Sequence, residues 1–232
     1  MSNDQQQPVN RRLRIHFTKQ GALRYISHLD LHSIWERSIR RAGLPLAYSQ
    51  GFHPQPKIQL GAALALGFIS RAELVDIWLT DDDQWQIFDL QDKFQASVPE
   101  GISIMDVQEV ELHGAALQIR IHTSEYEVTL LDELPTSALD EKIAAILAAE
   151  SIIRERRKRR KNKRFTTKWP TYDLRPLILD IHPLPSDGKN LRLFMRLVAR
   201  EGATGRPDEV LAELGIPVEA ARVERTRLIF DE

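Results

Sequence analysis

The order of polar and apolar residues constrains this chain most, because strand-like and helix-like patterns follow one another in a fixed sequence that occurs twice. Residues 12–18 alternate polar and apolar side chains, which is the period of a half-buried strand. Ser27-x-x-Asp30 is a capping-box pattern that precedes an apolar run with helical spacing. A chain that alternates such patterns has to bury its helices against a sheet, which predicts an α+β protein.

The first half of the chain has the order β-α-β-β-α-β. A helix begins after Ser27 and ends at Gly43, since Pro45 follows. Two prolines and a glycine make residues 51–56 a loop. The other expected elements are strands at 46–49, 74–79 and 102–110 and a helix at 83–96.

The second half repeats this order. A strand is expected at 126–130, and a second capping box, Ser137-x-x-Asp140, stands 110 residues after the first. The remaining elements are a hairpin of strands 177–181 and 191–197, a helix from Pro207 to Gly215 and a strand at 223–229. We interpret the chain as two tandem ferredoxin-like (βαββαβ) units with antiparallel sheets. The alternative is one mixed α+β domain with a shared sheet.

This interpretation divides the chain into three parts. Residues 1–10 are a polar N-terminal tail that we expect to be disordered, residues 11–113 form the first unit, and residues 114–232 form the second. The N-terminus has no apolar region of a signal peptide, and no run of 18 apolar residues exists. We therefore expect a cytoplasmic protein without membrane contact.

A formal net charge of −1 conceals a strongly basic segment, residues 154–168, inserted in the second unit. This segment carries a charge of +9, and the other 217 residues carry −10. Its basic residues, the predicted nucleic-acid-binding residues, are Arg154, Arg156, Arg157, Lys158, Arg159, Arg160, Lys161, Lys163, Arg164 and Lys168.

Ten cations in 15 residues repel one another unless a polyanion neutralises them, which favours phosphate binding. Phe165, Trp169 and Tyr172 lie within or just after the segment, and aromatic rings beside cations can stack on unpaired bases. The expected partner is therefore single-stranded RNA or a structured RNA loop. The alternative is a solvated extension without a specific partner. An anionic membrane fits less well, since an opposed apolar face is missing.

A second set of residues could take part in binding or catalysis. They lie on the first helix and on the loop that follows it: Ser27, His28, Asp30, Tyr48, Gln50, Phe52, His53 and Lys57. Ser27 and Asp30 are typical helix caps. His28 or His53 could act as an acid or base, or simply bond to nearby backbone. Because Pro54 and Pro56 stiffen the loop, we expect it to pack near Ser27–Asp30 and form one surface with the helix N-terminus.

The sequence lacks the residues that several kinds of chemistry require. The absence of cysteine excludes disulfides, iron–sulfur clusters, thiolate zinc sites and cysteine nucleophiles within these 232 residues. His28, His32 and Glu36 share a helical stripe, which is more typical of a polar helix edge than of a metal site. Motifs for nucleotide hydrolysis or dinucleotide binding are also missing. We expect no cofactor and no metal, and assign no catalytic residue.

Residues 23–30, 35–45 and 48–54, together with Lys57, resemble the radical-SAM-linked protein family of uncharacterised function. Residues 207–211 and 225–228 match more loosely, and His32 stands where that family would have an apolar residue. Members are encoded beside radical-SAM enzymes or fused to them. The resemblance implies a companion of a separately encoded radical-SAM enzyme, since this chain lacks the cysteines of that cluster.

The expected fold is also similar to that of repeat-associated RNA-binding proteins, which include CRISPR RNA-processing endonucleases. Those enzymes usually carry a glycine-rich loop near the C-terminus, and residues 223–232 contain none. The leading hypothesis is therefore an RNA-binding accessory protein that acts with a separate radical-SAM enzyme in RNA modification or processing. The alternatives are a metal-independent endoribonuclease that uses His28 or His53, and a protein-interaction scaffold for the radical-SAM partner.

Overall fold

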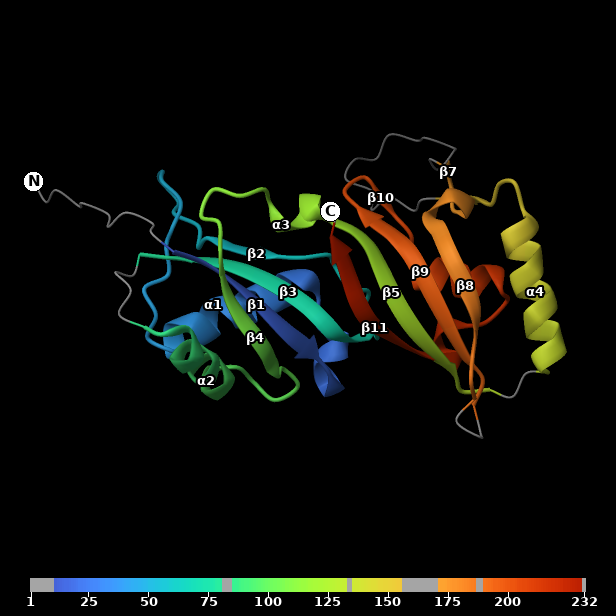
Figure 1. Ribbon diagram of the computed structural model, residues 1–232, viewed down its shortest axis with the longest axis horizontal. Coiled ribbons are helices and arrows are strands. Elements are labelled where there is room, and N and C mark those ends of the chain that lie inside the picture. Colours follow the sequence, from blue (N-terminus) through green and yellow to red (C-terminus); the bar gives the residue numbers. More distant parts are fainter. Residues whose placement is uncertain (1–10, 81–84, 133–134, 156–170, 187–189, 231–232) are drawn as a thin grey trace, which may run out of the picture. The chain divides into compact units, whose positions relative to one another are not determined.

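The computed structural model describes residues 11–80, 85–132, 135–155, 171–186 and 190–230. The chain divides into two compact units: residues 1–122 with 224–232, and residues 123–223. Figure 1 shows the elements of both units in sequence colours. The predicted N-terminal tail lies outside the described residues, and the boundary predicted at 113/114 stays a prediction.

The first unit has the ferredoxin-like order of elements. These are β1 (Arg11–Lys19), the 3-10 helix η1 (Gly21–Tyr25), α1 (His28–Arg41), β2 (Ile58–Leu60), β3 (Ile69–Leu79), α2 (Ile87–Ser97), β4 (Ile104–Val110), α3 (Leu117–Arg120) and most of β11 (Ala221–Phe230). β1 pairs antiparallel with β3 and β4, and β2 pairs antiparallel with β3. The resulting strand order β4-β1-β3-β2 is that of a split βαββαβ unit. β11 adds a short parallel pairing to β3.

The helix predicted after Ser27 is confirmed with its capping box. The Ser27 Oγ accepts a hydrogen bond from the backbone N–H of Asp30, and the Asp30 carboxylate accepts one from the backbone N–H of Ser27. Gly43 follows the helix with a φ of 70°, a left-handed conformation in which glycine carries no Cβ penalty. The sequence therefore determines both ends of α1 locally.

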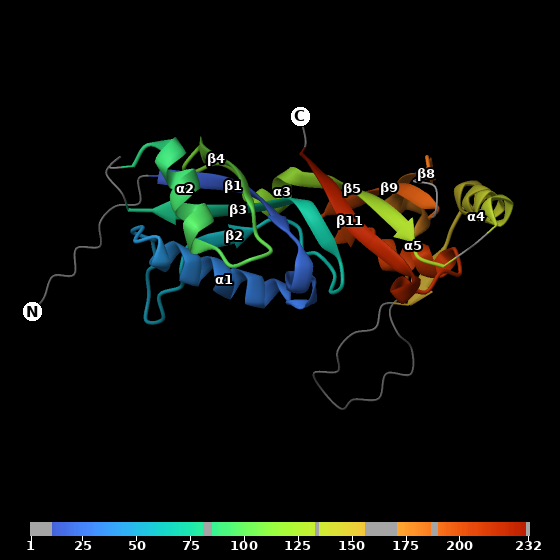
Figure 2. The same cartoon turned by 90° about the horizontal axis from the view of Figure 1, so that it is seen from below.

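The core of this unit lies between the helices and one face of the sheet. Leu13, Ile15 and Phe17 of β1 are fully buried there. The Trp35 ring of α1 packs edge-on against Phe17, with ring centroids 4.9 Å apart, and against Phe94 of α2, at 6.2 Å. Figure 2 shows α1 running along the strands that it covers.

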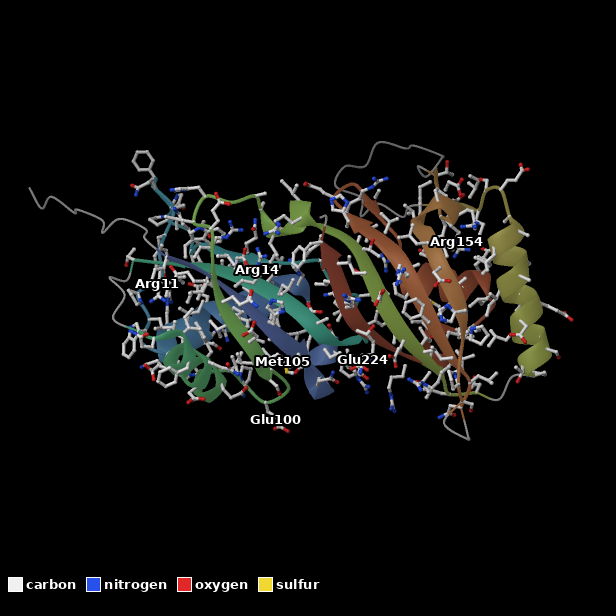
Figure 3. All side chains as sticks on the ribbon, in the orientation of Figure 1. Arg11, Arg14, Glu100, Met105, Arg154 and Glu224 are labelled. Atoms are coloured by element: carbon white, nitrogen blue, oxygen red, sulfur yellow. The ribbon has the colours of Figure 1, made fainter. Side chains whose placement is uncertain are left out.

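The other face of β1 carries arginines, and they are buried as well. Asp76 of β3 is completely buried and accepts hydrogen bonds from Arg12 at 2.7 Å and from Arg14 at 2.8 Å. Arg12 also donates to three backbone carbonyls of the segment after β4, those of Glu111, Gly114 and Ala115. Figure 3 labels Arg14 over the strands of this unit.

The second unit repeats the arrangement with additions. It contains most of β5 (Ile121–Leu130), α4 (Thr136–Ala148), β6 (Ile153–Glu155), β7 (Thr171–Asp173), the 3-10 helices η2 (Arg175–Leu177) and η3 (Val218–Ala220), β8 (Ile178–Leu184), β9 (Arg192–Arg200), β10 (Ala203–Thr204) and α5 (Pro207–Glu213). β9 pairs antiparallel with β5, β8 and β10, which confirms the predicted hairpin of β8 and β9. The predicted fold class is confirmed: the structure is α+β, with ferredoxin-like units whose strands pair mostly antiparallel.

Two local predictions were wrong. The second capping box does not form, because α4 begins directly after Pro135 and Ser137 therefore lies inside the helix. The strand expected at 46–49 is reduced to two isolated bridges, Leu46 to Leu79 and Tyr48 to Pro56. The Pro45 ring and the two prolines of the following loop remove backbone donors, so a continuous ladder cannot form there. The short pair β6 and β7 was not predicted.

The buried position of Asp76 predicts a large loss of stability on its neutralisation. In Asp76→Asn, two buried guanidinium groups lose their carboxylate, and we expect the free energy of unfolding to fall by about 3–5 kcal/mol. Urea denaturation measures it. The control is Glu109→Gln, whose side chain is 45% exposed beside Arg11 and should cost less than about 1 kcal/mol. Equal effects of the two substitutions would contradict the prediction.

Candidate functional site

The basic segment begins and ends on one small antiparallel ladder. β6 pairs with β7 through Ile153 with Asp173, Arg154 with Tyr172, and Glu155 with Thr171. The nine predicted nucleic-acid-binding residues from Arg156 to Lys168 lie outside the described residues. Because Glu155 and Thr171 are paired, the chain between them leaves and returns at the same place in the second unit.

The base of this ladder is fixed by Asp173. Its carboxylate accepts the backbone N–H of Ile152 at 2.8 Å and that of Arg175 at 3.0 Å. These backbone hydrogen bonds, that of Ile152 first, hold the pKa of Asp173 below its usual value. The ladder is thereby tied to the end of α4 on one side and to η2 on the other.

Arg154, the described member of the basic set, forms ion pairs with α5. Its guanidinium group lies 2.9 Å from Glu209 and 3.3 Å from Glu213. These contacts fasten β6 to the helix. This role was not predicted, although Asp208 and Glu209 directly follow Pro207 in the sequence.

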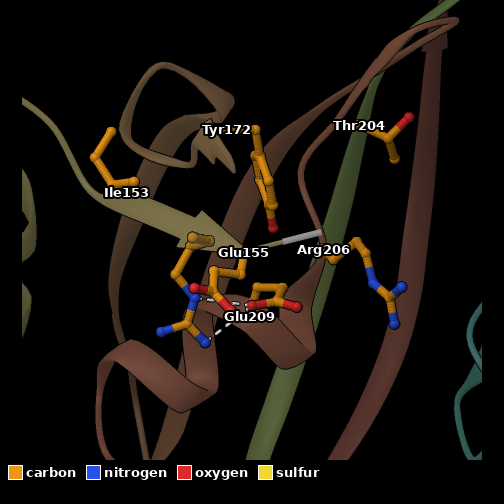
Figure 4. A pocket seen from close by; sticks show the side chains of 7 residues that line it. Ile153, Glu155, Tyr172, Thr204, Arg206 and Glu209 are labelled. Atoms are coloured by element: carbon orange, nitrogen blue, oxygen red, sulfur yellow. Dashed lines mark hydrogen bonds and ion pairs between the residues drawn. The ribbon is translucent and has the colours of Figure 1, made fainter. Parts of the chain in front are cut away.

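A cavity of about 550 Å³ lies beside the ladder. Its lining comes from β6, β7, β10 and the start of α5: Ile153, Arg154, Glu155, Tyr172, Thr204, Arg206 and Glu209. Figure 4 shows the Tyr172 hydroxyl pointing toward the carboxylates of Glu155 and Glu209. Burial, and then the charge of Glu209, raises the pKa of the Tyr172 phenol, so this group stays neutral and can donate a hydrogen bond.

The single surface expected from the helix N-terminus and the following loop does not form. Ser27 caps the first turn of α1, whereas the Tyr48 hydroxyl accepts a hydrogen bond from Arg40, near the last turn, at 3.0 Å. A helix of 14 residues separates the two places by about 20 Å. Figure 2 shows the loop at the end of α1 that is remote from its first residue.

The loop instead closes on itself, which explains the wrong prediction. The Ser49 backbone N–H donates to the Gln55 carbonyl at 2.8 Å, and the Gln55 N–H donates to the Ser49 Oγ at 2.9 Å. Gln50, Phe52 and His53 are exposed at its tip. The Lys57 backbone N–H donates to Ala47 at 2.8 Å.

His28 lies beside a row of buried polar residues that sequence reasoning missed. The strand pairings place Lys19 of β1, Ser70 of β3 and Arg225 of β11 next to one another. All three are at most 2% exposed. Arg225 donates from its Nε to Glu73 at 3.1 Å and also to the Ala62 carbonyl at 2.9 Å.

This row, with Glu73, contains two cationic groups and one carboxylate. Lys19 donates to the carbonyl of Ile26, two residues before His28, over 3.4 Å. Burial lowers the pKa of the Lys19 amine and of the His28 imidazole, and the charge of Glu73 opposes both shifts. A hint in the sequence was the acidic residue Glu73, which directly precedes the strand predicted at 74–79.

Within the described residues, no group of three or more His, Asp or Glu side chains could hold a metal ion. Glu36, the third member of the stripe considered in the sequence, instead pairs with Arg40 at 2.7 Å. None of the helices in the described part of the chain has the length and apolar content that crossing a membrane requires.

The sequence model of a family described as an uncharacterized protein conserved in bacteria (DUF2344) matches residues 12–207. This agrees with the uncharacterised family that the motifs indicated, and the link to radical-SAM enzymes stays a prediction. No curated protein matches the sequence.

Solved structures with similar chains include a Cbf5–Nop10–Gar1 complex, with a TM-score of 0.47 and 12% identity over 95% of this chain and 50% of the other. An H/ACA RNP bound to a substrate RNA containing 2'-deoxyuridine has a TM-score of 0.44 and 13% identity over 95% and 49%. The chain thus spans about half the length of these chains. Identities this low identify no shared function.

The buried row allows a test by opposite substitutions. Lys19→Met removes the surplus cation, and we expect the free energy of unfolding at pH 7 to stay unchanged or to rise, by up to about 4 kcal/mol. Arg225→Met leaves the Glu73 carboxylate buried without its cation and should cost about 3–5 kcal/mol. Denaturant titration of both variants measures these effects. A large loss in Lys19→Met would contradict this description of the row.

The lowered histidine pKa values predict a pH dependence. Burial lowers the pKa of His16 and of His28 below 6.5, so the unfolded chain binds protons in this range before the folded chain does. Stability should therefore fall as the pH drops below about 6.5. Denaturation between pH 5 and 7 should show a smaller slope in His28→Gln and in His16→Gln, and the smallest in the double variant. Unchanged slopes in all three would refute the assignment.

Proposed function

The chain belongs to the DUF2344 family of uncharacterized bacterial proteins, and we propose that it is an RNA-binding accessory protein whose basic segment holds the RNA backbone. The observation that carries the proposal is the concentration of charge. A segment of +9 is attached to a chain that otherwise carries −10. A polyanion is therefore attracted to one place and repelled elsewhere.

The attachment of the segment supports this proposal. The flanking residues Glu155 and Thr171 are paired in the ladder, and Arg154 ties that ladder to α5. A basic stretch held at both ends loses less conformational entropy on binding than a free tail does. Tyr172 brings an aromatic ring to the same ladder, which favours RNA with unpaired bases over a membrane surface.

The proposed partner for the chemistry is a separately encoded radical-SAM enzyme. The sequence contains no cysteine, so these 232 residues cannot hold the iron–sulfur cluster that starts radical-SAM reactions. In this proposal the chain presents RNA and the partner modifies it. Co-purification of a tagged chain with the enzyme encoded beside it tests this part by itself.

RNA affinity should depend strongly on salt. If five to eight phosphates are neutralised, a plot of log affinity against log salt concentration should have a slope of roughly −3.5 to −5.5. Replacing Arg156, Arg157, Arg159 and Arg160 by alanine should reduce the slope by up to about three units, because each lost phosphate contact removes about 0.7. Titration of a single-stranded oligonucleotide at several salt concentrations measures this slope.

A control with the same change in net charge separates local from general electrostatics. Arg37, Arg71, Arg222 and Arg227 are exposed and scattered over other elements, and their fourfold alanine variant should keep the slope. Equal losses in the two variants would mean that net charge, and not the basic segment, governs binding.

The second candidate function is metal-independent RNA cleavage. It is favoured by the position of His28 beside Lys19 and Glu73, which offers an imidazole next to a cation and a carboxylate. Intact RNA after incubation supports the accessory function. Cleaved RNA, with cleavage lost in His28→Ala or in His53→Ala, supports the endoribonuclease. Neither binding nor cleavage, together with co-purification of the partner, supports the scaffold.

A further inference from the structure

We propose that the cavity beside the β6–β7 ladder, lined by Tyr172, Glu155, Arg206 and Glu209, binds one unpaired nucleobase of the RNA. This inference rests on the proposed function and adds to it a site that distinguishes between nucleobases. The cavity measures about 550 Å³, which is ample for one base and part of its ribose.

The charge of the lining selects a base and not a phosphate. Arg154 and Arg206 contribute two positive charges, and Glu155 and Glu209 contribute two negative charges. Arg154 is already neutralised by Glu209, and Arg206 lies 2.6 Å from Asp208. A phosphate would meet carboxylates, while both cations are already paired with acidic residues, so it would be repelled. A nucleobase is neutral and planar and carries hydrogen-bond donors and acceptors at its edge. It can therefore bond both to the carboxylates and to the guanidinium groups of this lining.

The side chains offer the contacts by which proteins hold single bases. Tyr172 provides an aromatic face, and its neutral hydroxyl can donate. The carboxylates accept only, so they fit the exocyclic amino group of cytosine, adenine or guanine. The guanidinium group of Arg206, whose side chain is 55% exposed, donates to ring nitrogens or carbonyls. Uracil has no amino group and fits this lining less well.

The position of the cavity links it to the backbone contacts. Tyr172 pairs with Arg154 in the ladder and comes one residue after Thr171, to which the chain returns after residues 156–170. A strand of RNA held by the basic segment therefore passes near the cavity. Phosphate contacts and base contacts would then divide between neighbouring parts of one unit, the first supplying affinity and the second preference for the base.

The experiment compares oligonucleotides of twelve cytidines and twelve uridines, which carry the same phosphates, on the full chain. Tyr172→Leu removes the ring, and we expect it to weaken binding of the cytidine oligonucleotide about 5- to 150-fold, the range for loss of one stacking contact. The salt slope should not change, because no phosphate contact is lost. Tyr172→Phe is the matched control and should keep most of the affinity.

Glu155→Gln supplies a test that leaves the ring in place. The Glu155 side chain is exposed, so the substitution does not disturb the core, and it should reduce the preference for cytidine over uridine. Photo-crosslinking followed by mass spectrometry should place a nucleotide on Tyr172.

The outcomes separate the two proposals. Salt-dependent binding that is identical in the wild type, Tyr172→Leu and Glu155→Gln would overturn the base site and leave the proposed function standing. Absence of salt-dependent RNA binding in the wild type would overturn the proposed function, and the base site with it. A weakened Tyr172→Leu with an unchanged salt slope, an intact Tyr172→Phe and a crosslink at Tyr172 would support both.

Discussion

The first unit depends on one buried carboxylate. Asp76 lies in the middle of β3 and is bonded to Arg12 and Arg14, two residues apart on β1. Because side chains alternate between the faces of a strand, a register shift of one residue would move both guanidinium groups into the apolar core under Trp35. The bonds from Arg12 and Arg14 to Asp76 therefore determine the register between β1 and β3. Arg12 extends the effect to the segment after β4 through the carbonyl of Gly114, 2.8 Å away.

The same strand supplies a carboxylate to its other face, where Glu73 bonds to Arg225 of the last strand. On each face a single acid meets two buried cations: Arg12 and Arg14 on one, Arg225 and Lys19 on the other. The physical consequences differ. Guanidinium groups stay charged and share a carboxylate with good geometry. The Lys19 amine has a lowered pKa and only a long hydrogen bond, so it is the group that can exist uncharged.

Much of the fold could be predicted, because it depends on local patterns. The alternation at residues 12–18 and the capping box of Ser27 each determine an element without help from distant residues. Burial of the polar face of β1 was not predictable, since it requires the carbonyls of residues almost 100 positions later. The cavity at Tyr172 could not be predicted either, because its lining also comes from distant parts of the sequence. Thr204 and Glu209 reach it only after β6, β7 and α5 have come together, whereas the basic segment is visible in the sequence itself.

The distribution of charge connects the cavity with the proposed function. An RNA strand would be repelled by a body with a net charge of −10 and attracted by a segment of +9, so its position would be determined before any base is recognised. Recognition can then use acidic groups, which would otherwise oppose binding. Glu209 illustrates this, because it neutralises Arg154 through one carboxylate oxygen and still has acceptor sites to offer. Long-range attraction by the basic segment would bring the RNA, and a locally neutral cavity would discriminate between its bases.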